Sequence, residues 1–184
     1  EIMKWEEYQL KFDQILSGEF TDSPYDDPAY VEYVKLNNSR SKRWIKKGEL
    51  TDDIKSKLDS VQAKQKWILI TEPWCGDAAH LTPFIKMMAD YSKHIELEIQ
   101  KRDSEQSEIH NYLTNGGKSI PKLIVRDENG KDLYNWGPRP KEPQAIFMNR
   151  KSSNQTAEEN KSELQVWYNK DKGISMQKEL AELI

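Results

Sequence analysis

Apolar residues in the first third of the chain recur at the three- and four-residue spacing of amphipathic helices. The apolar stripe of the first helix, predicted over 4–17, comprises Trp5, Tyr8, Phe12, Ile15 and Leu16. Asp27 and Pro28 fit the N-cap and first position of a second helix, and Thr51 opens a third. The sequence therefore predicts a helical extension over 1–64 whose apolar stripes need a surface to pack against.

Beyond this extension, the pattern changes to short apolar strands separated by helical segments. The predicted strands cover 67–71, 95–99, 122–126 and 131–136. A helix containing Pro83 follows the first strand. Ser104 is predicted to cap a short helix that continues through Leu113, and Asn129-Gly130 form a hairpin turn before the last strand. This alternation is typical of an α/β fold in which helices cover a sheet.

The C-terminal part of the chain has a weaker pattern. Residues 150–163 are almost wholly polar, which predicts either a solvated helix or a loop. Apolar residues return from Leu164 onward and predict a terminal helix. A helical segment over 151–184 is therefore expected to pack on the same α/β domain, which is predicted to cover 65–150.

Composition and charge limit the classes of function. The net charge of −3 gives no reason to expect nucleic acid or an anionic membrane as a partner, and the apolar runs are too short to span a bilayer. The three histidines fall in different predicted elements without ligands at metal-binding spacing, so no metal and no other cofactor is expected. A single thiol and no visible secretory signal predict a cytoplasmic protein. The sequence predicts no oligomeric state.

The single cysteine of the chain, Cys75, stands where a strand ends and a helix begins. A thiol at the first turn of a helix faces unpaired backbone N–H groups and the positive end of the helix dipole, and both favour the thiolate. Asp77 acts in the opposite direction, because a carboxylate two residues away disfavours a second negative charge. Cys75 is thus either a reactive nucleophile or a structural thiol, and both interpretations stay open.

Four features, in order, make the region 65–150 resemble the thioredoxin superfamily. They are Trp74-Cys75-Gly76 between strand and helix, Pro83 in that helix, Ile120-Pro121 before the third strand, and Gly137 after the hairpin. The resemblance implies a thioredoxin-like fold, with a central mixed sheet flanked by helices, to which the helical extension and the C-terminal helices are added. It also implies a cis peptide bond at Pro121. The segment Glu72–Ala78, together with Trp136–Pro140, is similar to a bacterial subgroup in which the last motif position is usually not cysteine.

Two departures from the thioredoxin pattern bear on chemistry. Ala78 replaces the resolving cysteine of a Cys-x-x-Cys motif, and Leu69 occupies the place of the buried aspartate of the family. A mixed disulfide on Cys75 therefore has no neighbouring thiol to release it. Dithiol reductase activity is excluded unless a second thiol comes from elsewhere.

Two functions follow as alternatives. In the first, Cys75 forms a mixed disulfide with a protein or a low-molecular-weight disulfide, and an external thiol such as glutathione resolves it. The chain is then a monothiol thiol-disulfide oxidoreductase that serves cell redox homeostasis. In the second, it is a redox-inactive binding or scaffold protein with the same fold. The residues predicted to contact a substrate are Trp74, Gly76, Asp77, Ile120 and Pro121.

Other residues near the motif have two interpretations each. Trp74 either shields the thiol as part of an apolar rim or lies in the core. His80 is about 140° around the helix from the thiol, so it is expected to be solvated or to cap the helix rather than to act as a base. Three residues near the end of the hairpin either rim the cysteine face or pack on the terminal helices: Tyr134, Trp136 and Arg139.

Overall fold

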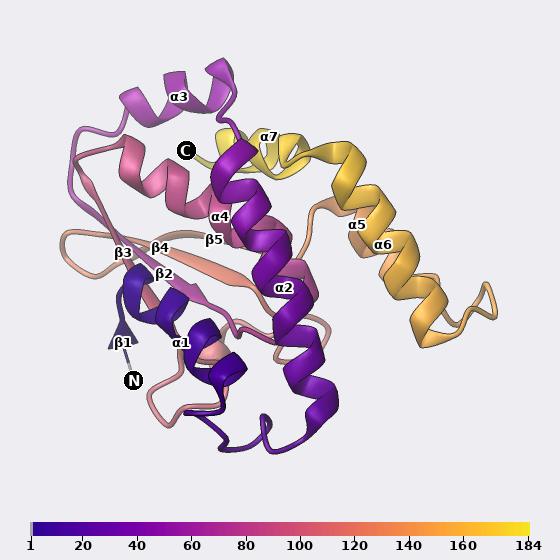
Figure 1. The fold of residues 1–184 in the computed structure, drawn as a ribbon. Helices are drawn as coiled ribbons and strands as arrows, with labels where there is room; N and C mark the ends of the chain where they lie inside the picture. The colour runs from indigo at the N-terminus through magenta and orange to yellow at the C-terminus, as the bar shows by residue number, and fades with distance from the viewer. Residues whose placement is uncertain (1) are drawn as a thin grey trace.

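A five-stranded sheet runs through the centre of the protein, whose residues 2–184 are described by a computed structural model (Figure 1). The strands are β1 (Ile2–Met3), β2 (Gln65–Ile70), β3 (Ile95–Gln100), β4 (Lys122–Asp127) and β5 (Asp132–Trp136). They lie in the order β1-β3-β2-β4-β5. β2 and β3 are parallel and the other neighbouring pairs are antiparallel, so the sheet is mixed, as the family resemblance implies.

Seven α-helices accompany the sheet within residues 2–184. They are α1 (Trp5–Ser17), α2 (Pro28–Lys47), α3 (Asp52–Asp59), α4 (Gly76–Tyr91), α5 (Lys141–Met148), α6 (Ala157–Asp171) and α7 (Ile174–Leu183), with a short 3₁₀ helix, η1, at Glu108–Asn111. In Figure 1, α1, α2 and α4 stand on one side of the sheet, α3 packs with α7, and α5 and α6 extend as a pair. None of the helices in this part of the chain combines the length and apolarity needed to cross a membrane.

Local caps start the helices of the N-terminal region. At the beginning of α2, the Asp27 side chain accepts a hydrogen bond from a backbone amide, and Thr51 does the same at the beginning of α3. The helix predicted over 4–17 is confirmed by α1, although Leu16 lies at the exposed edge of its apolar stripe. Capping residues therefore predict these boundaries well.

The pleat of β2 divides the core between the two faces of the sheet. Trp67 and Leu69 belong to the larger apolar cluster, which also contains residues of α1, α2, α4 and α7. Ile68 and Ile70 belong to the smaller cluster, which also contains Cys75. All four strand residues are buried, so β2 is a central strand packed on both faces.

The first strand lies in a region for which the sequence predicts helices alone. Ile2 and Met3 pair with Gln100 and Ile99 at the edge of the sheet. A strand of two residues is too short to show an alternating pattern, so periodicity does not predict it.

The segment between β3 and β4 forms less helix than the sequence predicts. Only η1 is present, and the Ser107 side chain, rather than that of Ser104, caps it by accepting a hydrogen bond from the Ile109 amide. The Gln100 side chain at the end of β3 holds this turn, because it donates to the Glu108 carboxylate and accepts from the Glu108 amide. Leu113 lies beyond the turn and is 47% exposed, so no apolar stripe supports a longer helix.

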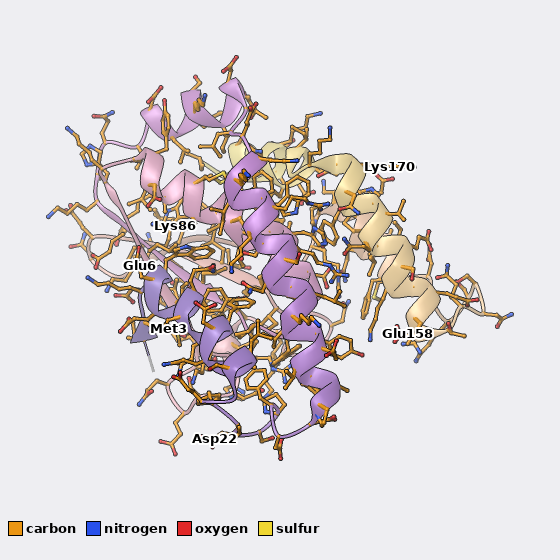
Figure 2. The ribbon with its side chains drawn as sticks, viewed as in Figure 1. Met3, Glu6, Asp22, Lys86, Glu158 and Lys170 are labelled. Atoms are coloured by element: carbon orange, nitrogen blue, oxygen red, sulfur yellow. The ribbon has the colours of Figure 1, made fainter. Side chains whose placement is uncertain are left out.

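The polar segment 150–163 contains both structures that the sequence leaves open. Its first residues form turns, and α6 begins within it, where Thr156 and Glu159 form a reciprocal capping box. Figure 2 places Glu158 at the end of the α5–α6 pair that points away from the sheet.

Candidate functional site

Cys75 occupies the N-cap position of α4, after the turn that follows β2. Its side chain is 6% exposed and packs in the smaller apolar cluster with Ala78, Ile109 and Ile120. The sulfur lies 3.5 Å from the backbone carbonyl oxygen of Ile120, to which the thiol donates a hydrogen bond. The cysteine is therefore a buried thiol held against the loop that precedes β4.

Burial and a neighbouring carboxylate keep the Cys75 thiol protonated. Loss of solvation, followed by the charge of Asp77, raises the pKa of Cys75 to about 12. The backbone amides of Ala78 and Asp77 and the guanidinium of Arg139 act in the opposite direction, but their effect is smaller. The helix terminus therefore does not produce the thiolate that its position alone would favour.

The loop before β4 forms the wall opposite the cysteine. The Ile120–Pro121 peptide bond is cis, as expected, and both residues are buried. Gly137 has a φ of +115°, and a Cβ at this position would collide with the Pro121 carbonyl oxygen, so the position requires glycine. The buried Lys122 donates from its Nζ to the Gly137 carbonyl oxygen at 2.7 Å. This contact joins the start of β4 to the segment after β5.

Asp77 is held by two side chains from distant parts of the chain. Its Oδ1 accepts hydrogen bonds from Arg139 Nε at 2.9 Å and from the Tyr168 hydroxyl at 2.7 Å. Arg139 also donates to Gln144 of α5, and its guanidinium lies 3.9 Å from the centroid of the Phe147 ring. The carboxylate thus connects the first turn of α4 to α5 and α6.

Tyr134, Trp136 and Arg139, for which the sequence allows either the cysteine face or the terminal helices, lie in different places in the structure. Arg139 lies at the cysteine face through its ion pair with Asp77. Trp136 instead donates from its indole nitrogen to Glu179 of α7. Tyr134 is half-buried against the larger apolar cluster. Only Arg139 is therefore positioned to influence the thiol.

Trp74 forms a half-buried rim beside the cysteine. Tyr30 of α2 meets its ring edge to face, with the centroids 6.2 Å apart. The guanidinium of Arg102 lies 4.7 Å from the centroid of the indole ring. Trp74 also packs against both apolar clusters. It therefore combines the two interpretations that the sequence allows, since it forms a rim beside the thiol and also contacts the core.

Helix α2 holds the turn that carries the cysteine. The buried Asn37 side chain donates to the Pro73 carbonyl oxygen at 3.0 Å. Arg40, one turn further along, donates to Asn37 Oδ1 at 3.1 Å and lies beside the half-buried Gly76. Asn37 and Pro73 are 36 positions apart, so no local motif indicates this contact.

His80 is buried, so the solvated or capping role predicted for it is wrong. Its Nδ1 accepts a hydrogen bond from the Trp44 indole at 2.9 Å, and its Nε2 lies 2.7 Å from the Gln165 amide oxygen. Because an indole can only donate, Nδ1 is unprotonated and Nε2 carries the proton. The ring stacks on Tyr168 with centroids 4.6 Å apart. Burial lowers the pKa of His80 to about 4, so it bridges α2, α4 and α6 as a neutral side chain.

Glu72 is a buried residue beside the motif that sequence reasoning missed. It lies two residues after the end of β2, is 7% exposed, and accepts a hydrogen bond from the Arg102 amide at 3.0 Å. Burial raises the pKa of Glu72 to about 7. Its signal in the sequence is a carboxylate placed between an apolar strand and a proline, where the chain has not yet left the core.

The site contains the protonated thiol of Cys75, the buried carboxyl group of Glu72 and the carboxylate of Asp77, which is ion-paired with Arg139. Among residues 2–184, no three His, Cys, Asp or Glu side chains gather in a way that could hold a metal ion.

Comparisons with known proteins identify the family and the fold. A family model described as thioredoxin matches residues 25–158, a region that begins before α2 and ends within α6. A solved protein of unknown function from Pseudomonas aeruginosa is 18% identical, with a TM-score of 0.53 over 72% of this chain and 86% of that one. An HIV epitope-scaffold is 15% identical, with a TM-score of 0.55 over 98% of this chain and 97% of that one. At these identities the two structures show a shared fold. No curated protein matches the chain.

Proposed function

We propose that this chain, which belongs to the thioredoxin family, is a binding protein whose single thiol does not turn over in disulfide exchange. The observation that carries the proposal is that the Cys75 sulfur is buried and already donates to the Ile120 carbonyl oxygen. Burial and the Asp77 charge raise the pKa of Cys75 to about 12, so the nucleophilic thiolate is scarce near neutral pH. Cys75 is the single cysteine of this sequence, so no thiol of the chain itself can release a mixed disulfide from it.

The proposed binding face surrounds this thiol. Its residues are Trp74, Gly76, Asp77, Ile120 and Pro121. Trp74 supplies an aromatic rim, and the loop before β4 is held by Lys122 and Gly137, so an extended protein segment could lie across a fixed surface. The Asp77 charge is already paired, which favours recognition through apolar contact. A bacterial source and a cytoplasmic location stay predictions.

The alkylation rate of Cys75 tests the proposal. The native chain would be treated with iodoacetamide from about pH 6 to about pH 10, with the urea-unfolded chain as the reference for a free thiol. We expect the native rate to be at least about tenfold lower and the apparent pKa to lie above about 8.5. An apparent pKa below about 7 would overturn the proposal. Cys75→Ser provides the background rate.

Monothiol disulfide exchange is the second candidate, because two α4 amides and the Arg139 guanidinium oppose part of the rise in the pKa of the thiol. In this reaction the Cys75 thiolate attacks one sulfur of a disulfide, forms a mixed disulfide and releases the other sulfur as a thiolate. Glutathione then attacks the mixed disulfide, which frees Cys75 and leaves a disulfide between glutathione and the substrate. The thiol must first leave the Ile120 carbonyl oxygen.

A glutathione-coupled assay separates the two candidates. The rate at which glutathione reduces a protein disulfide would be measured with the chain and with Cys75→Ser. The binding proposal predicts equal rates, whereas monothiol exchange predicts that the acceleration disappears in the variant.

A further inference from the structure

A cavity of about 440 Å³ lies beside Trp74, between the N-terminal helical region and the loops that follow β2 and β3. Residues of α1, the α1–α2 segment, the turn before α4 and the loop before η1 line it. Cys75 does not line this cavity, although Trp74 borders both places. Its volume is in the range of cavities that hold small molecules.

Five aromatic side chains, which we name the aromatic wall, surround this cavity. They are Tyr8, Phe20, Tyr25, Tyr30 and Trp74. Phe20 and Tyr25 meet edge to face with centroids 5.9 Å apart, and Tyr30 and Trp74 do so at 6.2 Å. Because the rings hold one another in place, the wall presents a fixed apolar surface suited to a flat ligand.

Three cations lie over this wall. The Nζ atoms of Lys11 and Lys101 are 4.4 Å and 5.5 Å from the centroid of the Phe20 ring, and the Arg102 guanidinium is 4.7 Å from that of Trp74. The nearby Asp103 carboxylate is engaged by Arg102 and, from outside the cavity, by a further lysine. Glu72 is the other acidic side chain of the lining, and burial favours its uncharged form, so the three cations outnumber the charged carboxylates, which favours an anionic group on the ligand.

Polar groups occupy other parts of the lining. The Tyr8 hydroxyl lies 3.3 Å from Thr71 Oγ1, and Glu72 accepts a hydrogen bond from the Arg102 amide. The Tyr25 hydroxyl is buried and has no hydrogen-bond partner within residues 2–184. Burial raises the pKa of Tyr25; the Trp74 amide is near enough to offset a small part of that effect, but it makes no hydrogen bond of normal geometry to the hydroxyl. Such a hydroxyl is a buried polar group that a bound molecule could satisfy.

We propose that the cavity binds a small aromatic carboxylate. The ring of the ligand lies against the aromatic wall, and its carboxylate pairs with the ammonium group of Lys11, with that of Lys101 nearby. An aromatic amine is a poorer ligand, because the same ammonium groups repel it. The site goes beyond the proposed function, since it uses neither the thiol nor the loop before β4.

Three matched probes test the chemistry of this site by isothermal titration of the full chain. Phenylacetate combines the ring with the anion, cyclohexylacetate lacks the aromatic ring, and phenethylamine replaces the anion with a cation. We expect phenylacetate to bind with a Kd below about 1 mM and the other two to bind at least about fivefold more weakly. Absence of saturable phenylacetate binding at about 10 mM, or equal affinity for phenethylamine, would overturn the proposal.

Substitutions locate the binding. Lys11→Gln should weaken phenylacetate binding by about threefold to tenfold, whereas Lys151→Gln, at an exposed position between α5 and α6, should leave it unchanged. If circular dichroism shows that Lys11→Gln does not fold, Lys101→Gln tests the same charge. Unchanged affinity in a folded lysine variant would overturn the assignment. Cys75→Ser should bind phenylacetate as the parent does, so this test is independent of the proposed function.

Discussion

Cys75, Glu72 and His80 share one physical circumstance, since each is less than a tenth exposed and each is more stable in its uncharged form. Asp77 differs from them, because its ion pair with Arg139 supplies a compensating charge. The motif therefore has one engaged carboxylate next to a protonated thiol. Because the charge of Asp77 helps to raise the pKa of Cys75, the reactivity of the thiol depends on that charge.

Replacing Asp77 by asparagine is expected to raise the reactivity of Cys75. The substitution removes the second-largest cause of the raised pKa and leaves the Arg139 guanidinium near the thiol without its carboxylate. Alkylation at about pH 8 should become roughly threefold to tenfold faster. Asp13→Asn, at an exposed position of α1, is the matched control. An unchanged rate in folded Asp77→Asn would mean that burial alone sets the pKa of the thiol.

Glu72 and His80 are expected to make opposite contributions to the pH dependence of stability. Burial raises the pKa of Glu72 from 4.5 to about 7, so its contribution to the free energy of unfolding is full below pH 4.5 and is lost as the pH rises to about 7. Burial lowers the pKa of His80 from 6.5 to about 4, so its contribution is full above pH 6.5 and is lost as the pH falls to about 4. Between pH 4.5 and 6.5 the two effects oppose each other.

Single substitutions should therefore reveal a pH dependence that the parent chain hides. Over this interval, Glu72→Gln is expected to become more stable as the pH rises, and His80→Gln less stable, each by about 2 kcal/mol. Urea unfolding at closely spaced pH values measures these free energies. Two variants with the pH profile of the parent would show that neither group titrates as its burial implies.

The same residues show what sequence can and cannot predict at this scale. The position of Cys75 and the cis bond at Pro121 follow from local order and from the family resemblance, and the structure has both. The burial of His80 depends on hydrogen-bond partners 36 and 85 positions away, so its place on one helix gives the wrong environment. Glu72 was missed for a similar reason, since its hydrogen-bond donor lies 30 positions away.

Among the elements, α2 has the most direct role at the site, because it holds the turn before α4. Its first residue follows from a local cap, Asp27, which is why the sequence predicts where α2 begins. Its position over the turn that carries Cys75 depends on the packing of α2 against α4, and no local sequence pattern describes that packing. The same limit explains the segment around η1, where the side chain of Gln100 overrides an expected helix.

Asn37→Ala is expected to loosen the turn that carries Cys75. The substitution leaves the Pro73 carbonyl oxygen without its side-chain donor in a buried place, which should lower the free energy of unfolding by about 1–3 kcal/mol. Because the turn loses this contact, alkylation of Cys75 should also become faster. Asn38→Ala, one residue further on, is the control for a change of helix propensity. Equal stability of the two variants, with equal alkylation rates, would show that α2 does not position the turn.

The larger apolar cluster packs together side chains from the N-terminal, central and C-terminal parts of the chain. This cluster contains buried residues from Met3 to Ala181, so it includes side chains from all three regions that the sequence suggests. The matched family region, 25–158, likewise crosses the predicted boundaries near residues 64 and 150. Sequence periodicity divides the chain where the pattern changes, whereas the cluster is formed by contacts between distant segments. The division into three regions therefore stays a prediction about pattern, and unfolding can test whether it has a thermodynamic meaning.

We expect thermal unfolding of the chain to be a single cooperative transition, with far- and near-ultraviolet circular dichroism giving the same midpoint. Tyr168→Ala should lower that midpoint by roughly 5–15 °C without splitting the transition, because it removes a buried ring that stacks on His80 and bonds Asp77. Val166→Ala, at an exposed position of the same helix, should change it little. If α6 and α7 instead unfolded separately, Tyr168→Ala would produce an early transition in far-ultraviolet dichroism, before the main transition of the sheet. That result would make the C-terminal helices an independent unit, and Asp77 would then lose one of its two partners before the sheet unfolds.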